Sequence, residues 1–177
     1  FEPVHVEIES DDLASANVEQ RFYSVARADK YKLLLNCLKT MGVERAIVFA
    51  NRRHITRDLA EKLQKDGIKS ALLSGEVAQA KRVKTLEQFR SGQTPILVAT
   101  DVAGRGIHVD GVSHVFNYDL PEELEDYVHR IGRTGRAGAS GIAISFASED
   151  DAFIIPDLEI MLGKRLECEP TPNELLV

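Results

Sequence analysis

The chain has 177 residues, of which 44% are hydrophobic and 28% are charged, and its formal net charge is −6. This length and composition are typical of one globular domain with a single core. The acidic balance excludes a broad polycationic surface, so any binding of nucleic acid must use a local basic strip. Cys37 and Cys168 lack metal-ligand spacing and indicate a reducing compartment, and no apolar run reaches the roughly 20 residues of a membrane helix. We therefore expect a cytoplasmic protein with neither a metal site of its own nor a membrane partner.

Residues 1–19 alternate apolar and acidic side chains and then become polar, which predicts a short strand followed by a linker. Because this strand is detached from the regular pattern that follows, we expect it to pair with a sheet outside this chain. The chain then divides into an inter-domain strand and linker (1–19), a compact domain (20–165) and a C-terminal tail (166–177). Since it opens at Phe1 without a methionine, we expect an excised fragment.

From residue 20 onward, short apolar strands alternate with amphipathic helices. Strands are predicted at 20–25, 46–50, 70–73, 96–99, 115–117 and 142–146, and helices at 30–41, 79–89, 122–131 and 150–162. A further helix carries Ile55, Leu59 and Leu63, with Asn51 placed to cap it and Gly67 to end it. Continuous apolar strands separated by helices predict an α/β fold, in which a mostly parallel sheet is covered by helices on both faces.

Polar residues and glycines follow four of these strands directly: Asn51, Ser74-Gly75, Thr100-Asp101 and Asn117–Asp119. Each of them alone could be explained by capping or turn chemistry. Together they mark one rim of the sheet, because the carboxyl ends of parallel strands lie at the same edge. Open α/β sheets bind their ligands at this edge. The sequence therefore predicts a binding rim.

Several rim residues suit phosphate groups. Gly75 lets the backbone approach a ligand closely, and Gln79 and Arg82 lie three residues apart on one helix face. Arg82 could be solvent cover beside its lysine neighbours, but we favour a phosphate contact. Thr100 can donate to a phosphate, while Asp101 could orient an arginine such as Arg130 or Arg133. Because few aromatic residues are interleaved, we expect contacts to the nucleic-acid backbone with weak sequence preference.

The stretch 127–138 concentrates positive charge in a glycine-rich turn. Arg133 and Arg136 flank Thr134-Gly135, and two guanidinium groups at this spacing can reach one polyphosphate from two sides. His129 could be a base, a metal ligand or a hydrogen-bonding helix residue, and we favour the last. The chain has no G-x-x-x-x-G-K-[ST] loop and no acidic cluster for magnesium. We therefore expect the triphosphate cradle to lie on another domain, to which this chain supplies arginine fingers.

At these residues the chain resembles the second RecA-like domain of a DEAD-box ATP-dependent RNA helicase, over nearly all of residues 20–163. The resemblance rests on five segments, namely Ile47–Phe49 with Asn51 (motif IV), Leu73–Gly75 with Gln79-x-x-Arg82, residues 99–107 (motif V), Asn117–Pro121, and His129–Arg136 (motif VI). The last segment is the most specific of them. Within the family, the runs 73–79 and 116–140 look most like one bacterial member.

The resemblance implies a role for each matching residue. RNA contacts are implied for Asn51, Gly75, Gln79, Arg82 and Thr100. ATP contacts are implied for Arg133, Arg136, Gly106 and His108, with Arg136 as the finger on the γ-phosphate. Coupling between the two domains is implied for His129, Arg130 and Asp101. One position departs from the family, because His108 stands where an aspartate usually contacts the ATP ribose, which puts that contact in doubt.

The resemblance also implies ATP and Mg²⁺ as cofactors, both held mainly by a missing first domain, so we expect this chain alone to be inactive. The implied partners are RNA, the first RecA-like domain and an RNA-degrading assembly with a ribonuclease E scaffold and polynucleotide phosphorylase. An alternative is a protein-docking module that tethers a helicase to that scaffold, with segments 150–162 and 167–177 as candidate surfaces. A DNA helicase is disfavoured by the match at 129–136.

Overall fold

The computed structural model describes residues 4–7, 17–75, 78–135, 140–163, 165–166, 168–172 and 175–176. Its strands are β1 (Val4–Glu7), β2 (Asn17–Ser24), β3 (Ala46–Phe49), β4 (Ser70–Leu73), β5 (Ile96–Ala99), β6 (His114–Asn117), β7 (Ser140–Ala147) and β8 (Glu169–Pro170). Its helices are the short 3₁₀ turn η1 (Arg27–Asp29), α1 (Lys30–Thr40), α2 (Arg53–Lys65), α3 (Gln79–Arg90), α4 (Asp101–Gly104), α5 (Leu124–Ile131) and α6 (Ile155–Leu162).

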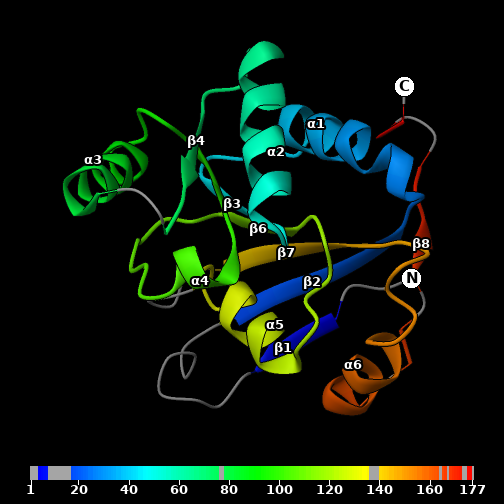
Figure 1. The fold of residues 1–177 in the computed structure, drawn as a ribbon. Coiled ribbons are helices and arrows are strands. Elements are labelled where there is room, and N and C mark those ends of the chain that lie inside the picture. The colour runs from blue at the N-terminus through cyan, green and yellow to red at the C-terminus, as the bar shows by residue number, and fades with distance from the viewer. Residues whose placement is uncertain are drawn as a thin grey trace.

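The strands form one sheet in the order β1-β2-β7-β6-β3-β5-β4, and β8 also pairs with β2 (Figure 1). Every pairing except β1 with β2 is parallel. Crossover helices join the parallel strands, as this topology requires. The prediction of a mostly parallel α/β sheet is therefore confirmed.

Alternation along the central strands divides the core between two faces of the sheet. In β3, Ala46 and Val48 pack with α1 and α2, whereas Ile47 and Phe49 pack on the opposite face with α3 and α4. On that second face, α5 and α6 cover β2 and β7. Helices thus lie on both faces in three layers, which confirms the predicted architecture. Within the described residues, no helix is both long and apolar enough to cross a bilayer.

The expectation that the first strand pairs outside this chain is wrong. β1 lies antiparallel to β2, with Val4 opposite Gln20 and Glu7 opposite Asn17. The physical reason is that β2 has a free hydrogen-bonding edge on the side away from β7, and such an edge is a template for another strand. β8 pairs with the same strand further along, where Tyr23 lies opposite Glu169. The sequence did not predict β8.

His114, on the central strand β6, is only 5% exposed. His114 Nδ1 is hydrogen-bonded to the Ser113 hydroxyl at 2.8 Å, and the same hydroxyl lies 3.0 Å from the Arg45 carbonyl. Nε2 has no hydrogen-bond partner among the described residues. Burial, reinforced by the charge of Arg21, lowers the pKa of His114 below its usual 6.5. Folding therefore favours the neutral form of this imidazole.

We predict that His114 makes the domain less stable in mild acid. Between about pH 6.5 and the lowered pKa of the folded chain, the unfolded chain binds a proton at this imidazole that the folded chain does not, so stability falls as the pH drops, by up to about 1.4 kcal/mol per pH unit for this one group. Urea unfolding between pH 7.5 and 5.5 measures the slope. His114→Asn should have a shallower slope than the wild type, whereas His54→Asn, at an exposed position on α2, should match it. Equal slopes for both variants would contradict the assignment.

Candidate functional site

The carboxyl ends of four strands meet at one edge of the sheet. Phe49 of β3 lies beside Ala99 of β5 and Asn117 of β6, and Leu73 of β4 lies beside Ala99. The residues that follow these strands are those that the sequence placed at a common rim. The predicted convergence is therefore present.

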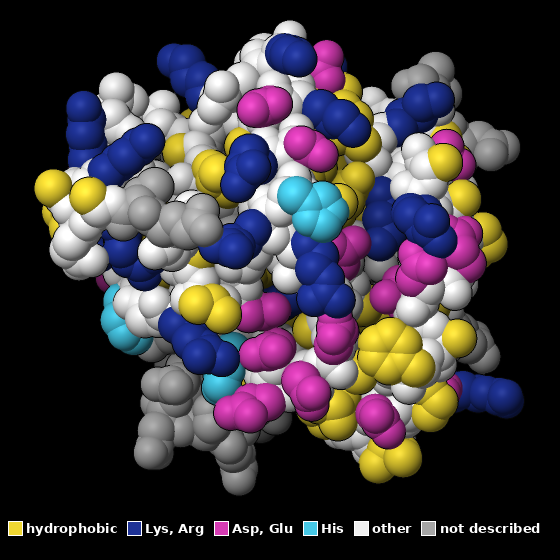
Figure 2. All heavy atoms as spheres, in the orientation of Figure 1, with side chains coloured by type: hydrophobic (Ala, Val, Ile, Leu, Met, Phe, Trp, Pro, Cys, Tyr) yellow, Lys and Arg dark blue, Asp and Glu magenta, His cyan; other side chains and the backbone are white. Residues whose placement is uncertain are grey.

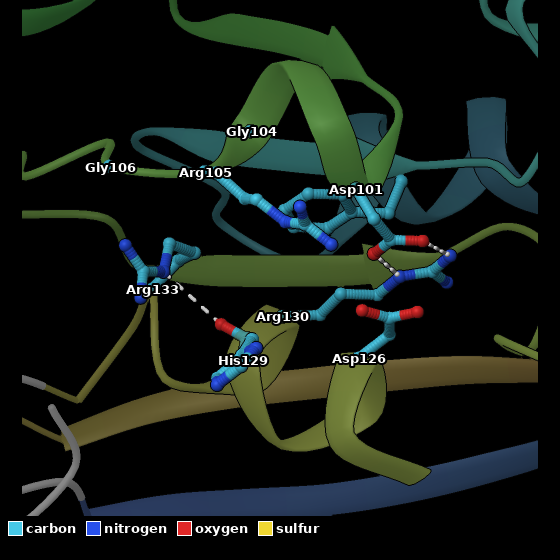
Figure 3. Close-up of a pocket in the computed structure, with 9 residues that line it drawn as sticks. Asp101, Gly104, Arg105, Gly106, Asp126, His129, Arg130 and Arg133 are labelled. Carbon is cyan, nitrogen blue, oxygen red and sulfur yellow. Dashed lines mark hydrogen bonds and ion pairs between the residues drawn. The ribbon is translucent and has the colours of Figure 1, made fainter. Parts of the chain in front are cut away.

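Arg130 of α5 is the centre of this rim (Figure 3). Its side chain is 1% exposed. Nε donates to Asp101 Oδ1 at 2.6 Å and Nη2 to Asp101 Oδ2 at 2.7 Å, which is a bidentate, charge-assisted contact. Nη1 donates to the Asp119 carbonyl at 2.7 Å, and Nη2 also to Asn51 Oδ1 at 2.7 Å. One guanidinium therefore joins the segments that follow β3, β5 and β6.

The predicted contact between Asp101 and an arginine is present, and the arginine is Arg130. The guanidinium carbon also lies 5.4 Å from the centre of the Phe49 ring, on the last residue of β3. With its donors directed at Asp101, Asn51 and the Asp119 carbonyl, Arg130 organises the rim and does not extend into solvent. Its role between two domains stays a prediction.

Asn51 does not cap the following helix, as the sequence predicted. The residue at the N-cap of α2 is Arg52, which makes no side-chain cap hydrogen bond. Asn51 Nδ2 instead donates to the Leu120 carbonyl at 3.0 Å, and its main-chain N–H donates to Asp119 Oδ2 at 3.1 Å. Tertiary partners across the rim have replaced the local cap, because Arg130 offers the side-chain oxygen Oδ1 of Asn51 a charged donor.

Arg130 and the acceptors that it joins are called the Arg130 hub below. A cavity of about 580 Å³ opens beside this hub. Asn51, Gly75 and Thr100 line it together, as the sequence predicted for a shared rim. Thr100 also caps α4, because its hydroxyl oxygen accepts from the Ala103 N–H at 3.4 Å. The hydroxyl proton can still donate to a ligand. The wall carries both signs of charge, including an ion pair of Arg52 with Glu122 at 2.7 Å across exposed side chains.

Arg82 of α3 reaches the same region from the other side. Its Nη1 donates to the Ala103 carbonyl at 2.9 Å and its Nη2 to the Arg105 carbonyl at 3.3 Å. These bonds hold the turn around α4, a short helix that the sequence did not predict. Gln79, one turn earlier on α3, is exposed.

A smaller cavity, of about 150 Å³, lies between α4 and α5. Asp101, Gly106, His129, Arg130 and Arg133 are among the residues that line it (Figure 3). His129 is exposed at the end of α5. Asp126 also faces this cavity, and burial together with the charge of Asp101 raises the pKa of its carboxyl.

Arg133 is 9% exposed and is held by its own domain. Nε donates to the His129 carbonyl at 3.1 Å and Nη1 to the Ile107 carbonyl at 2.6 Å. Its side chain therefore lies along the cavity wall and does not project from the rim as the sequence suggested for a finger. Its Nε and Nη1 donors are thus already bound within the domain.

Three further residues, Arg136, Gly106 and His108, were predicted to contact ATP. Arg136 falls in 136–139, outside the described residues, so its position at the site stays a prediction. Gly106 adopts a left-handed conformation, with φ of 75°, after α4. His108 follows in the same loop with an exposed side chain, and its carbonyl accepts from Arg90 Nη2 at 3.5 Å.

Figure 2 shows how charge is distributed on one face of the molecule. Lys and Arg side chains gather over α3 and, mixed with Asp and Glu side chains, over α2, whereas Asp and Glu side chains gather over α5. The basic strip that an acidic protein needs for binding a polyanion is therefore on the α2 and α3 side of the rim.

The sequence reasoning missed Lys30 at the start of α1, which is 3% exposed and lies 3.0 Å from Asp119 Oδ1 through its Nζ. A weak signal was available. A cation in the first turn of a helix is disfavoured by the helix dipole, so a lysine there requires a compensating partner.

Comparison with known proteins identifies related chains. The family described as "Helicase conserved C-terminal domain" matches residues 29–138. The ATP-dependent RNA helicase RhlB of Pseudomonas syringae pv. tomato is 59% identical over 175 residues, which cover 99% of this chain and 44% of that protein. The chain thus spans less than half the length of this relative. RhlB is the bacterial member that the runs 73–79 and 116–140 resemble.

Two solved structures have the same fold. The E. coli DEAD-box protein SrmB, bound to the regulator of ribonuclease activity A (RraA), is 37% identical with a TM-score of 0.81, and the match covers 89% of this chain and 93% of that chain. S. cerevisiae Dbp5, bound to RNA and ADP BeF3, is 31% identical with a TM-score of 0.75, covering 88% of this chain and 42% of that chain.

We predict that Asp101→Asn lowers the free energy of unfolding by roughly 2–3 kcal/mol, because it leaves the buried guanidinium of Arg130 without its carboxylate. This loss is smaller than for a fully buried pair, because the Asp101 side chain is 22% exposed and solvent screens its charge. Asp126→Asn, in the same cavity, removes a carboxylate that faces Asp101 and should be neutral or slightly stabilising at pH 7. Urea unfolding of the two variants measures the difference, and equal losses would contradict a special role for the Asp101–Arg130 contact.

Proposed function

Since this chain belongs to the conserved C-terminal domain family of helicases, and within it to the DEAD-box proteins, we propose that it is the second RecA-like domain of an ATP-dependent RNA helicase. The observation that carries the proposal is the Arg130 hub. It fixes Asn51 and Asp101 at the rim where the sheet would receive a ligand. ATP hydrolysis and RNA unwinding are proposed for the whole protein, with a first domain as partner.

We assign the larger cavity to the RNA backbone. Asn51, Gly75 and Thr100 line it, and Arg82 lies behind α4 with Gln79 one turn away. Arg82 uses two nitrogens on carbonyls, and a guanidinium has five N–H donors, so further donors can reach a phosphate. The basic side chains over α2 and α3 add attraction without sequence preference. Backbone contacts of this kind favour broad RNA specificity.

We assign Arg133 and Arg136 to ATP, with Gly106 and His108 near the nucleotide. The chemistry of the donor set fits phosphate, because arginine presents a planar, permanently charged fork. It does not fit magnesium, since no group of three or more His, Cys, Asp or Glu within the described ranges is arranged to bind a metal ion. ATP and Mg²⁺ are therefore held mainly by the first domain, and this chain supplies only positive charge.

Coupling between the domains is proposed for His129, Arg130 and Asp101. His129 is exposed beside the smaller cavity, so it can contact a second domain. Arg130 and Asp101 link that cavity to the RNA rim through Asn51. A change in how the first domain docks on His129 would thus alter the position of Asn51.

We predict that Arg136→Ala in the complete helicase abolishes RNA-stimulated ATP hydrolysis and leaves ATP binding unchanged, because the finger acts in phosphoryl transfer and the first domain holds the nucleotide. Loss of such a finger costs about 10³–10⁵ in kcat. Steady-state hydrolysis and nucleotide titration measure the two quantities. Arg27→Ala, whose guanidinium pairs with Asp150 away from the rim, is the control. The isolated chain is the blank and should show no turnover; an unchanged rate for Arg136→Ala would remove the assignment.

A second function, docking to a protein scaffold, is favoured by the surface around α6. Phe153 is 58% exposed, Ile160 80% and Met161 36%, and exposed apolar side chains that lie together mark protein-interaction surfaces. The solved relative SrmB was captured with a protein partner. We propose ribonuclease E as the scaffold that contacts this surface, in an assembly that also contains polynucleotide phosphorylase and degrades RNA.

We predict that Ile160→Asp weakens binding of the helicase-binding segment of ribonuclease E at least about tenfold, since the change places a charge in a desolvated contact. Calorimetric titration of the chain with that segment measures the affinity. Val83→Asp is the control, because Val83 is likewise an exposed apolar residue (50%) but lies on α3. Absence of heat with the wild-type chain would leave only the enzymatic function.

A further inference from the structure

Lys30 is a buried lysine outside the segments assigned to the site. It begins α1, is 3% exposed, and its Nζ lies 3.0 Å from Asp119 Oδ1. The ammonium also lies 5.6 Å from the centre of the Tyr118 ring. Lysine is almost never buried to this extent unless its charge is paired, so the contact with Asp119 is what makes this burial possible. Its partner Asp119 is part of the rim.

The rim contains two buried cations and two carboxylates with a fixed pairing. Arg130 is paired with Asp101 through two hydrogen bonds, and Lys30 is paired with Asp119. The alternative pairing is close at hand, because Arg130 Nη1 already donates to the main-chain carbonyl of Asp119 at 2.7 Å. Arg130 is therefore the other cation that contacts Asp119, although at its main chain and not at its carboxylate. The observed pairing therefore depends on Asp119 being neutralised by another cation.

We propose that Lys30 is a positioning residue for the RNA rim: by neutralising Asp119, it keeps Arg130 on Asp101 and Asn51. The inference rests on the proposed function of Asn51 as an RNA contact. Asp119 Oδ2 accepts the main-chain N–H of Asn51 at 3.1 Å, so the same carboxylate also fixes the Asn51 backbone. Lys30 thus acts on Asn51 through Asp119 and Arg130, without touching the ligand.

Without Lys30, the Asp119 carboxylate would retain the Asn51 N–H but would lose its cation. An uncompensated carboxylate that is only 22% exposed is costly, and Arg130 is the cation that can relieve it. The neighbouring buried acid Asp151 is already bound by the Ser148 N–H and hydroxyl, at 2.7 and 3.1 Å. It therefore needs Lys30 less than Asp119 does. Moving Arg130 to Asp119 would release Asn51 Oδ1 and displace the predicted RNA contact.

The test uses RNA-stimulated ATP hydrolysis by the complete helicase. Lys30→Met should raise the RNA concentration for half-maximal stimulation about tenfold and leave the KM for ATP within about twofold, because ATP is proposed to be held mainly by the first domain. Adding Asp119→Asn to Lys30→Met removes the uncompensated charge and should restore the RNA dependence to within about threefold of the wild type. Lys32→Met, which removes the same charge from an exposed position on α1, is the control.

A purely structural ion pair predicts a different outcome. In that case Lys30→Met lowers the melting temperature and leaves the RNA dependence unchanged, which overturns the inference. A weakened RNA dependence that Asp119→Asn does not restore overturns it as well. If Lys30→Met does not fold, the double variant is still informative, because it buries neither charge. A folded double variant whose RNA dependence is tenfold weaker than the wild type would refute the proposal.

The proposed function is tested separately by Asn51→Ala. If Asn51→Ala leaves the RNA dependence unchanged, the RNA contact itself is wrong, whatever Lys30 does. If Asn51→Ala weakens RNA stimulation and Lys30→Met does not, only the inference about Lys30 fails.

Discussion

The bidentate contact between Arg130 and Asp101 is the interaction on which the arrangement of the rim depends. It joins the end of α5 to the start of α4, and the same guanidinium also holds Asn51 and the Asp119 carbonyl. A permanently charged group at 1% exposure is tolerated only because all of these acceptors converge on it. The loops after β3, β5 and β6 are therefore held in fixed positions relative to one another. The two cavities beside them share lining residues, among them Asp101.

Much of the fold follows from local patterns in the sequence. The apolar runs that became β3 and β5, and the periodicity of α1 and α2, predict a covered parallel sheet, and the polar residues after the strands predict the rim. The contact of Asp101 with an arginine could also be predicted, because an acidic residue that follows a strand at the rim can pair with an arginine of the nearby basic segment. The family resemblance at 129–136 agrees with the comparison to known helicases, and it supplied the roles that residue types alone leave open.

Other features depend on tertiary contacts that no local pattern carries. Asn51 matches a helix cap in sequence, yet Arg130, distant along the chain, competes for its side chain. Val83 stands three residues before Leu86, which packs against the core, yet Val83 is half exposed, because α3 lies at the end of the sheet beside β4. Lys30 has no motif at all. The pairing of β1 with β2 could not be predicted from composition, because it depends on the hydrogen-bonding edge of β2 that faces away from β7.

The pairing of β2 with both β1 and β8 also bears on how the domain behaves in a crowded solution. The two short strands together cover most of the outer edge of β2, since β1 pairs with residues 17–20 and β8 with residues 23–24. Trimming either one would uncover main-chain donors and acceptors that a neighbouring molecule can use. Self-association through strand addition, rather than loss of the core, would then be the first sign of damage at these segments.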